Sequence, residues 1–393
     1  MKIINFIILD KKTNYLYIQK SFNNQLYFPD QWKILGDQLK QNETIIECIH
    51  RKLFEETNLI LNCVYGKIHE FILDDKQTIN MVYLISASGR FKTKTYEISK
   101  HYWINKHELE NLIQRKDDIY ISYLKVFNLI EQKNNVKNTI INNLPKWLEG
   151  SKKISDFYFK NKNLLVEQKL DGTPVSIADR EIESFLKNEI YKVFPEYNFI
   201  GEENEYDYDE QCNFKWVIDP IDGTRSFIVG RPTFGVLISL VYNQIPIFGC
   251  IFQPFTNEIW TSFFSEELYY NNNLISNNSA IYNNIESFTS SPEVYKTKKE
   301  LKMYNSLKSI SNRLSYNGDC YAYGLLSLGF VNLIVEKELD RHDYCALVPI
   351  LSAANILFFS WEGIPIDYSC KKTSTIAFNS YNFDKLINLL IEK

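Results

Sequence analysis

Short apolar runs, each closed by polar or turn residues, recur along this chain and predict an α/β protein. The first covers residues 3–9, and an aspartate with two lysines closes it. Phe199 and Ile200 belong to another, and residues 216–218 form a third that Pro220 ends. Apolar runs of this length, bounded by turn residues, are typical of buried strands. We therefore expect a strand at each of these places.

Other apolar residues follow the spacing of a helix and help to divide the chain. A run from residue 144 to residue 158 has helical spacing, and another helix-like run follows Asp343. Residues 131–138 are polar and have no sustained apolar period, which is typical of a linker. We expect two domains, residues 1–132 and 133–393, as the length of the chain suggests.

Composition and charge narrow the classes of protein. Hydrophobic residues make up 45% and charged residues 23%, which describes an ordinary globular protein. A net charge of −4 without a basic stripe argues against nucleic-acid binding. The first apolar run is too short to span a membrane and lacks a cleavage site. Seven cysteines without Cys-x-x-Cys spacing favour a reducing compartment, so we expect a cytoplasmic protein without membrane attachment.

The stretch from Trp216 to Arg225 carries the strongest chemical signal. Asp219 follows the expected strand, Asp222 comes three residues later, and Gly223-Thr224 can open a helix. The free N–H groups of such a helix would face the same spot as the carboxylates. In metal-assisted phosphoryl transfer, metal ions take the carboxylates and backbone N–H groups take the phosphate. The competing interpretation is a surface turn, since Asp and Gly are common there.

Acidic residues elsewhere favour the phosphoryl site over the surface turn. Glu202 comes directly after the second expected strand, and Asp343 precedes the helix-like run. Residues 169–179 read Lys-Leu-Asp-Gly-Thr-Pro-Val-Ser-Ile-Ala-Asp. With residues 216–225, these segments resemble the inositol monophosphatase superfamily of magnesium-dependent, lithium-sensitive phosphomonoesterases. The resemblance covers about residues 137–393 and implies a layered αβαβα domain.

Within that superfamily the histidinol-phosphatase branch is the most similar. Three stretches carry this finer resemblance: residues 219–240, 318–325 and 343–350. The resemblance implies a hydrolase of small phosphomonoesters, with homodimers common among its members. An inositol, sugar or 3′-phosphoadenosine nucleotide phosphatase is the alternative in the same superfamily, and residues 318–325 disfavour the nucleotide branch. A nucleotide-binding scaffold without catalysis is the alternative outside it, and the intact set of acidic residues argues against it.

The resemblance implies a metal site made of oxygen donors. The implied ligands are four carboxylates and one backbone carbonyl, with a further carboxylate near a weaker ion bound through water: Glu202, Asp219, Asp222 and Asp343, the carbonyl of Ile221, and Asp179. Oxygen ligands alone argue for Mg²⁺ over zinc. By the same resemblance we expect two or three Mg²⁺ ions and inhibition by lithium.

The remaining roles also follow from the resemblance. Glu202 and Thr224 would orient and deprotonate an attacking water, while the amides of Gly223 and Thr224 would bind phosphate. Arg225 would reach the phosphate or a neighbouring group. No residue of the matched segments suggests a covalent nucleophile. The expected reaction is in-line attack by a metal-activated water.

Substrate recognition is expected from two acidic positions. Asp319 and Glu336 fall where superfamily members contact the alcohol portion of the substrate. A pair of carboxylates there suits a substrate with an amine, such as histidinol phosphate, or one with several hydroxyls. Departures from the family pattern, such as His342 and Ser360, fall on this substrate side rather than among the metal ligands.

The N-terminal third resembles a Nudix hydrolase, a fold with an α/β/α sandwich. Residues 36–59 fit the spacing of the Nudix box, with matches at these positions: Glu43, Arg51, Leu53, Glu55, Glu56 and Leu59. Lys52 stands where a metal-binding glutamate is usual and would repel a cation. Glu55 and Glu56 could still hold one metal weakly. Alternatively, Arg51–Glu55 and Lys52–Glu56 are ordinary ion pairs four residues apart on a helix.

Two functions stay open for this domain. In the first, the domain has lost hydrolysis and binds a nucleotide or nucleotide-sugar. In the second, the protein is bifunctional: the first domain cuts a diphosphate conjugate, and the second removes phosphate from the monoester released.

Overall fold

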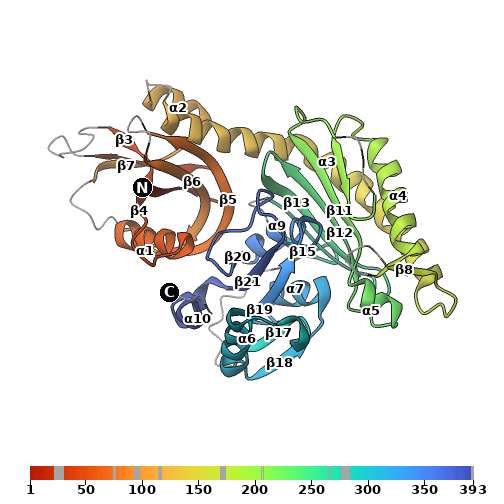
Figure 1. The fold of residues 1–393 in the computed structure, drawn as a ribbon. Helices are drawn as coiled ribbons and strands as arrows, with labels where there is room; N and C mark the ends of the chain where they lie inside the picture. The colour runs from red at the N-terminus through yellow and green to blue at the C-terminus, as the bar shows by residue number, and fades with distance from the viewer. Residues whose placement is uncertain are drawn as a thin grey trace.

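Two α/β regions joined by one long helix make up the chain (Figure 1). The computed structural model describes residues 1–21, 31–73, 77–92, 98–113, 117–168, 174–204, 206, 208–264, 267–275 and 284–390. Within the sequence segment 169–179, residues 169–173 lie outside the described residues.

The N-terminal region is a mixed sheet of order β3-β2-β1-β6-β5, with β4 paired to β1 and β7 to β2. Its elements are β1 (Lys2–Leu9), β2 (Leu16–Ser21), β3 (Trp32–Lys33), β4 (Leu35–Gln38), α1 (Ile45–Thr57), β5 (Ile60–Ile72), β6 (Ile79–Ser88), β7 (Ile98–Ile104) and α2 (Lys106–Leu112). Alternate side chains of β1 enter opposite layers, since Phe6 and Ile8 pack with α1 while Ile7 and Leu9 pack towards α3. The first expected strand and the sandwich are confirmed.

Helix α3 (Asp118–Tyr158) runs without interruption from the first region into the second (Figure 1). The prediction of a linker at residues 131–138 was therefore wrong. Lys133, Val136 and Ile140 are buried at intervals of three and four residues. One buried residue per turn is enough to pack the helix against its neighbours. A pattern with so few buried positions is too sparse to be recognised as a helical period in the sequence. The predicted boundary at residue 132 falls inside this helix and stays a prediction.

The second region contains a large sheet, β10-β11-β12-β13-β14-β15-β16, and a small sheet, β18-β17-β19-β21-β20. The strands, with the short pair β8–β9, are β8 (Val166–Gln168), β9 (Pro174–Ser176), β10 (Asn198–Gly201), β11 (Phe214–Asp222), β12 (Gly235–Tyr242), β13 (Ile245–Gln253), β14 (Glu258–Phe263), β15 (Leu268–Tyr270), β16 (Asn273–Ile275), β17 (Glu286–Thr289), β18 (Arg313–Tyr316), β19 (Leu333–Leu339), β20 (Ile356–Ser360) and β21 (Thr373–Asn379). The helices are α4 (Ile177–Tyr191), α5 (Thr224–Ile228), α6 (Lys298–Ile310), α7 (Asp319–Ser327), α8 (Arg341–Tyr344), α9 (Leu347–Ala353) and α10 (Phe383–Leu390), with 3₁₀ turns η1 (Pro292–Val294) and η2 (Ser380–Asn382).

The layers of this region follow from which faces are apolar. Helices α3 and α4 cover one face of the large sheet, where Trp147 meets Trp216 edge to face at 5.4 Å. Helices α7 and α9 fill the space between the two sheets, and α6 and α10 cover the small sheet. Burying each tryptophan contributes about 4–6 kcal/mol at most. The expected αβαβα order is confirmed.

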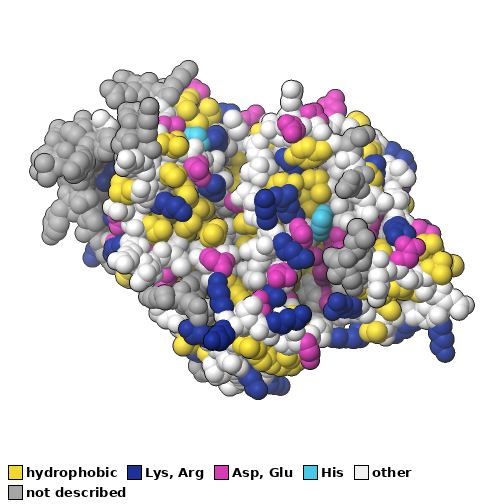
Figure 2. All heavy atoms as spheres, in the orientation of Figure 1, with side chains coloured by type: hydrophobic (Ala, Val, Ile, Leu, Met, Phe, Trp, Pro, Cys, Tyr) yellow, Lys and Arg dark blue, Asp and Glu magenta, His cyan; other side chains and the backbone are white. Residues whose placement is uncertain are grey.

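The surface carries no dominant field of one charge on the face drawn in Figure 2, where basic and acidic side chains of the described residues are interspersed. Among the described residues, no helix is both long and apolar enough to cross a membrane.

Candidate active site

Strand β11 brings Asp219 and Asp222 together through an irregularity. The strand continues to Asp222, so the prediction that Pro220 ends it was wrong. The pairing of β11 with β12 shifts register between Asp219 and Asp222. In a regular strand these residues would point to opposite faces, and the shift places both carboxylates at one site. Pro220 fits here because an irregular segment loses little from a missing N–H.

Asp343 completes a cluster with these two side chains. Among the described residues, Asp219, Asp222 and Asp343 form the one group of three or more potential ligands in which one oxygen from each side chain lies within 4.8 Å of the others. Backbone N–H groups orient each carboxylate: Ile221 N donates to Asp219 at 2.9 Å, Asp340 N donates to Asp343 at 2.6 Å, and Cys320 N donates to Asp222.

The electrostatics of the cluster favour a bound cation. Burial raises the pKa of Asp219, which is 1% exposed, and the charges of Glu202, Asp222 and Asp343 raise it further. Burial likewise raises the pKa of Asp343 to about 7. Carboxylates packed this closely repel one another when ionised, and a divalent ion offsets that repulsion. The donor set is made of oxygens, so the residues fit Mg²⁺.

Glu202 lies beside this cluster because β10 runs parallel to β11. The register pairs Gly201, the last residue of β10, with Ile218, so Glu202 comes level with Asp219 on the neighbouring strand. The charge of Glu202 contributes to the raised pKa of both Asp219 and Asp343. The structure thus brings Glu202 to the edge where the cluster lies, as the strand-end position predicts.

Glu183 on α4 orders the loop after Glu202, and the sequence interpretation missed it. Its side chain is fully buried and accepts hydrogen bonds from Glu203 N at 2.8 Å, Asn204 Nδ2 at 2.7 Å and Tyr206 Oη at 2.9 Å. These donors all belong to the segment that immediately follows Glu202. The sequence signal is weak, because a glutamate in an amphipathic helix usually faces solvent.

We expect Glu183→Gln to lower phosphate release by about 10- to 100-fold, because side chains that orient metal ligands have effects of this size. The glutamine amide would turn a donor towards groups that are themselves donors. Glu181→Gln is the matched control, since Glu181 is exposed on the same helix and accepts a hydrogen bond from the hydroxyl of Tyr158. Steady-state rates over a Mg²⁺ series test this. Equal rates for the two variants would contradict a positioning role for Glu183.

Asp179 and Thr224 meet at the rim of the cluster. The hydroxyl of Thr224 lies 3.2 Å from Asp179 Oδ1 and 3.1 Å from the carbonyl oxygen of Ile221, so it can donate to either. Asp179 also caps α4, where it accepts from Ser176 N at 2.9 Å. Burial raises the pKa of Asp179 to about 6. Three residues predicted from the resemblance are therefore joined in one network.

Gly223 forms the turn into α5, as the sequence predicts. It has a left-handed backbone with φ of 82° and precedes the first residue of the helix, Thr224. A Cβ at this position would lie 2.5 Å from Asp319 Cγ, so only glycine fits without displacing a neighbour. The turn at Gly223 therefore packs directly against Asp319, one of the predicted substrate residues. Arg225, the second residue of α5, is exposed.

A cleft of about 340 Å³ opens beside the cluster. Asp222, Asp343, Arg225, Asp319 and Glu336 all contribute to its lining. The structure thus gathers the predicted substrate residues and two of the predicted metal ligands around one space.

The two predicted substrate carboxylates are held differently from the cluster. Thr233 donates to Asp319 at 2.6 Å, and Ser290 donates to Glu336. Burial raises the pKa of Asp319, and it raises the pKa of Glu336 to about 7. A cationic group in the cleft would offset the free-energy cost that burial places on the charged form, and would therefore favour the ionised carboxylates.

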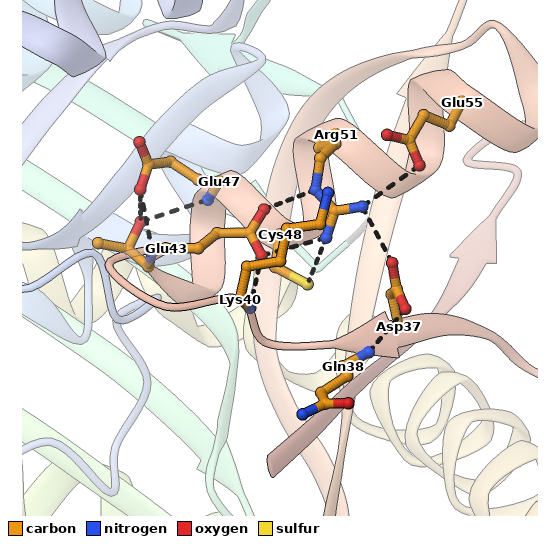
Figure 3. A network of polar contacts seen from close by, with 9 residues as sticks. Asp37, Gln38, Lys40, Glu43, Glu47, Cys48, Arg51 and Glu55 are labelled. Atoms are coloured by element: carbon orange, nitrogen blue, oxygen red, sulfur yellow. Dashed lines mark hydrogen bonds and ion pairs between the residues drawn. The ribbon is translucent and has the colours of Figure 1, made fainter. Parts of the chain in front are cut away.

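Arg51 organises the Nudix-like segment of the N-terminal region (Figure 3). Its guanidinium donates to Glu43 at 2.6 and 3.1 Å, to Asp37 at 3.0 Å and to Glu55 at 3.2 Å. The Arg51–Glu55 pair four residues apart is the one that the helix spacing predicts. Glu55 therefore faces a cation of the protein itself.

The carboxylate of Glu56 also has its partners within the domain. Lys52 Nζ lies 2.7 Å from one carboxylate oxygen of Glu56, and Gln19 Nε2 donates to the other at 3.0 Å. Glu56 is only 3% exposed. The predicted residual metal pair, Glu55 and Glu56, thus has separate partners, and the described residues of this domain include no group of three potential metal ligands.

Comparison with known proteins places this site in a family. The family model described as the inositol monophosphatase family matches residues 144–393. The chain belongs to the inositol monophosphatase family. A NUDIX domain model matches residues 2–124, so the N-terminal region is a NUDIX domain.

Similar proteins of this family include phosphatases with different names. The chain is 36% identical over 208 residues to bifunctional phosphatase IMPL2 of Arabidopsis thaliana, covering 52% of this chain and 60% of that protein's length. It is 31% identical over 222 residues to a histidinol-phosphatase of Chlorobaculum parvum, covering 55% and 83%. An inositol monophosphatase structure from Zymomonas mobilis superposes with a TM-score of 0.56 at 28% identity, covering 65% and 98%.

Proposed function

We propose that this protein is a Mg²⁺-dependent phosphomonoesterase whose catalysis lies in the C-terminal domain. The observation that carries the proposal is the cluster of Asp219, Asp222 and Asp343, within 4.8 Å, beside the turn at Gly223. The proposed ligands of two or three Mg²⁺ ions are the residues implied by the family: Glu202, Asp219, Asp222, Asp343, the carbonyl of Ile221, and Asp179. Bound Mg²⁺ would supply an activated water and stabilise the attacking and leaving oxygens.

The protein's own groups then orient the reactants. Glu202 would accept the proton of the water, with Thr224 nearby to help orient it, and the bond between Thr224 and Asp179 supports this arrangement. The backbone N–H groups of Gly223 and Thr224 bind the phosphate oxygens, with Arg225 at the exposed edge. The pKa of Asp343, about 7, means that metal and protons compete for the cluster near neutral pH.

The preferred substrate in this proposal is a phosphorylated amino alcohol that resembles histidinol phosphate. Asp319 and Glu336 line the cleft next to the cluster, and an ammonium group there would pair with these partly buried carboxylates. Histidinol-phosphatases of Chlorobaculum parvum and Streptomyces coelicolor are among the similar proteins. Inositol-1-monophosphatases and 3′(2′),5′-bisphosphate nucleotidases are also among them, so those substrates form the comparison set.

We expect L-histidinol phosphate to have a higher kcat/KM than inositol-1-phosphate or 3′-phosphoadenosine 5′-phosphate, in phosphate-release assays with Mg²⁺. Glu336→Gln should lower kcat/KM for the amine substrate by about 10- to 150-fold, since a charged hydrogen bond contributes about 1.5–3 kcal/mol, and should change inositol phosphate turnover little. Glu338→Gln is the control, because Glu338 is exposed. Equal use of all three substrates by the wild type would contradict amine recognition.

A second proposed function concerns the NUDIX domain, which we assign to binding a nucleotide or nucleotide-sugar without cleaving it. Glu55 and Glu56 are engaged by Arg51 and Lys52, which opposes Mg²⁺ binding. Near Glu56, Tyr17 packs against several rings that offer stacking surfaces: Phe91 at 5.2 Å, Trp103 at 5.7 Å and His101 at 6.1 Å. The competing bifunctional scheme requires cleavage at this same place.

Lys52→Glu distinguishes binding from cleavage. We expect calorimetry to show that the wild-type chain binds ADP-ribose, and we expect no release of AMP. The reason is that Lys52 lies 2.7 Å from Glu56 and pairs with the carboxylate that a metal ion would need. Lys52→Glu should create a metal-binding acidic cluster and raise any Mg²⁺-dependent release of AMP. Cleavage by the wild type at a rate that Lys52→Glu does not raise would support the bifunctional scheme. Dimer formation and a cytoplasmic location stay predictions.

A further inference from the structure

The loop between β20 and β21, residues 361–372, bonds to the NUDIX domain. The carbonyl oxygen of Gly363 accepts from Ile46 N at 3.1 Å, in the first turn of α1. Asp367 Oδ2 accepts from Lys67 N on β5 at 3.0 Å, and Asp367 is only 3% exposed. We call this segment the interdomain loop. Both bonds satisfy backbone N–H groups of the first domain with acceptors of the second.

Two close approaches make this docking specific. Gly363 has φ of 71°, and a Cβ there would lie 2.5 Å from Thr44 Cβ. Gly66 on β5 has φ of 136°, and a Cβ there would lie 2.8 Å from Asp367 Cβ. Glycine on either side of the contact therefore lets the two domains approach at backbone distance.

The same interdomain loop holds the helix that carries Asp343. The hydroxyl of Tyr344, a fully buried residue, donates to the carbonyl oxygen of Cys370. Arg341 Nε donates to the same oxygen at 3.4 Å, and its guanidinium lies 4.6 Å from the ring centroid of Tyr368. Because α8 is a single turn, it has little stability of its own, and these contacts fix its position.

Lys11 reaches the second element next to Asp343. From the turn after β1, its ammonium group donates to the carbonyl oxygen of Ser352 at 2.7 Å and to Asn355 Oδ1 at 3.1 Å. These acceptors lie at the C-terminal end of α9, where unpaired carbonyls and the helix dipole favour a cation. The NUDIX domain thus contacts the chain after Asp343 directly and braces α8 through the interdomain loop.

We infer that the NUDIX domain positions the metal ligand Asp343 of the other domain, with Lys11 and Asp367 as the positioning residues. The inference rests on the proposed function, in which Asp343 binds Mg²⁺. Loosening either contact lets residues 341–353 shift relative to Asp219 and Asp222. Mg²⁺ affinity then falls, although neither positioning residue touches the ion. The two domains are coupled through packed, hydrogen-bonded elements.

The test compares Lys11→Met with Lys12→Met in the full chain. Methionine retains an unbranched stem and removes the donor, and Lys12 is exposed beside it. We expect Lys11→Met to raise the Kd for Mg²⁺, measured by calorimetry, by about three- to tenfold. Hydrogen–deuterium exchange across residues 341–353 should become faster. Lys12→Met should match the wild type, and Lys11→Arg should recover most of the affinity because it restores a cationic donor.

Asp367 provides an independent variant pair. Asp367→Ala removes the acceptor of Lys67 N and should weaken Mg²⁺ binding, whereas Asp367→Asn keeps an acceptor and should bind more tightly than the alanine variant. Far-UV circular dichroism and thermal melting identify any variant that does not fold. If Lys11→Met and folded Asp367→Ala bind Mg²⁺ and exchange like the wild type, the inference is overturned.

The same measurements separate this inference from the proposed function. Loss of Mg²⁺ binding in Asp219→Asn, with wild-type binding in both positioning variants, overturns the inference alone. Mg²⁺ binding that survives Asp219→Asn overturns the proposed function and the inference with it.

Discussion

Asp219→Asn should lower Mg²⁺-dependent phosphate release by about 10³-fold or more, because it removes the charge of a buried proposed metal ligand from the acidic cluster. The side chain is 1% exposed and lies within 4.8 Å of Asp222 and Asp343. Asparagine has nearly the same shape and keeps an oxygen for the N–H of Ile221, so the fold should persist. Phosphate release from a panel of monoesters measures the effect. Activity within tenfold of the wild type would contradict the metal-site assignment.

The same variant has a predicted effect on stability with the opposite sign. Burial and neighbouring charges raise the folded-state pKa of Asp219 above its usual 3.8, so ionising it costs free energy in the folded protein. Without Mg²⁺, that contribution to stability is complete below pH 3.8 and is lost as pH rises through the raised pKa. Asp219→Asn should therefore melt at a temperature equal to or above that of the wild type in EDTA at pH 8. Thermal melts at pH 5 and pH 8 check this.

Gly223→Ala should lower phosphate release by about 10²-fold, since a misplacement near 1 Å at a reacting centre has an effect of that size. The added Cβ would lie 2.5 Å from Asp319 Cγ, and φ of 82° is unfavourable for alanine. Thr233 holds Asp319 at 2.6 Å, so the aspartate cannot move away freely. The strain should also lower the free energy of unfolding by about 1–3 kcal/mol. Steady-state kinetics and urea denaturation measure the two effects.

Gly230→Ala controls for backbone strain alone. Gly230 has a similar φ of 77°, but a Cβ there would only approach the flexible side chain of Lys160, at 3.1 Å. Gly230→Ala should lower the free energy of unfolding, because alanine is strained at this positive φ, and should retain most of the activity. If the two alanine variants lose equal activity, the close packing of Gly223 against Asp319 has no special role.

Local patterns in the sequence were enough to predict much of the architecture. Apolar runs located β1, β10 and β11. A short apolar run bounded by turn residues is typical of a buried strand, so the local sequence is enough to indicate it. The order of motifs predicted both families, which the family models confirm. It also identified Asp219, Asp222 and Asp343, which the structure brings together, while their metal roles stay predictions.

Other features depended on residues that are distant in the chain. The path of β11 beyond Pro220 depends on its pairing with β12. The helix at residues 131–138 depends on the packing of one buried side chain per turn against the rest of the protein. Glu183 matters because the loop after Glu202 folds onto it.

The contact between Lys11 and α9 joins residues of different domains. Sequence by itself determined the local elements and the acidic residue set, because periodicity and turn chemistry act over a few neighbours. Tertiary structure alone decided which buried polar groups meet. A buried donor or acceptor must find a partner, and that partner can lie anywhere in the chain.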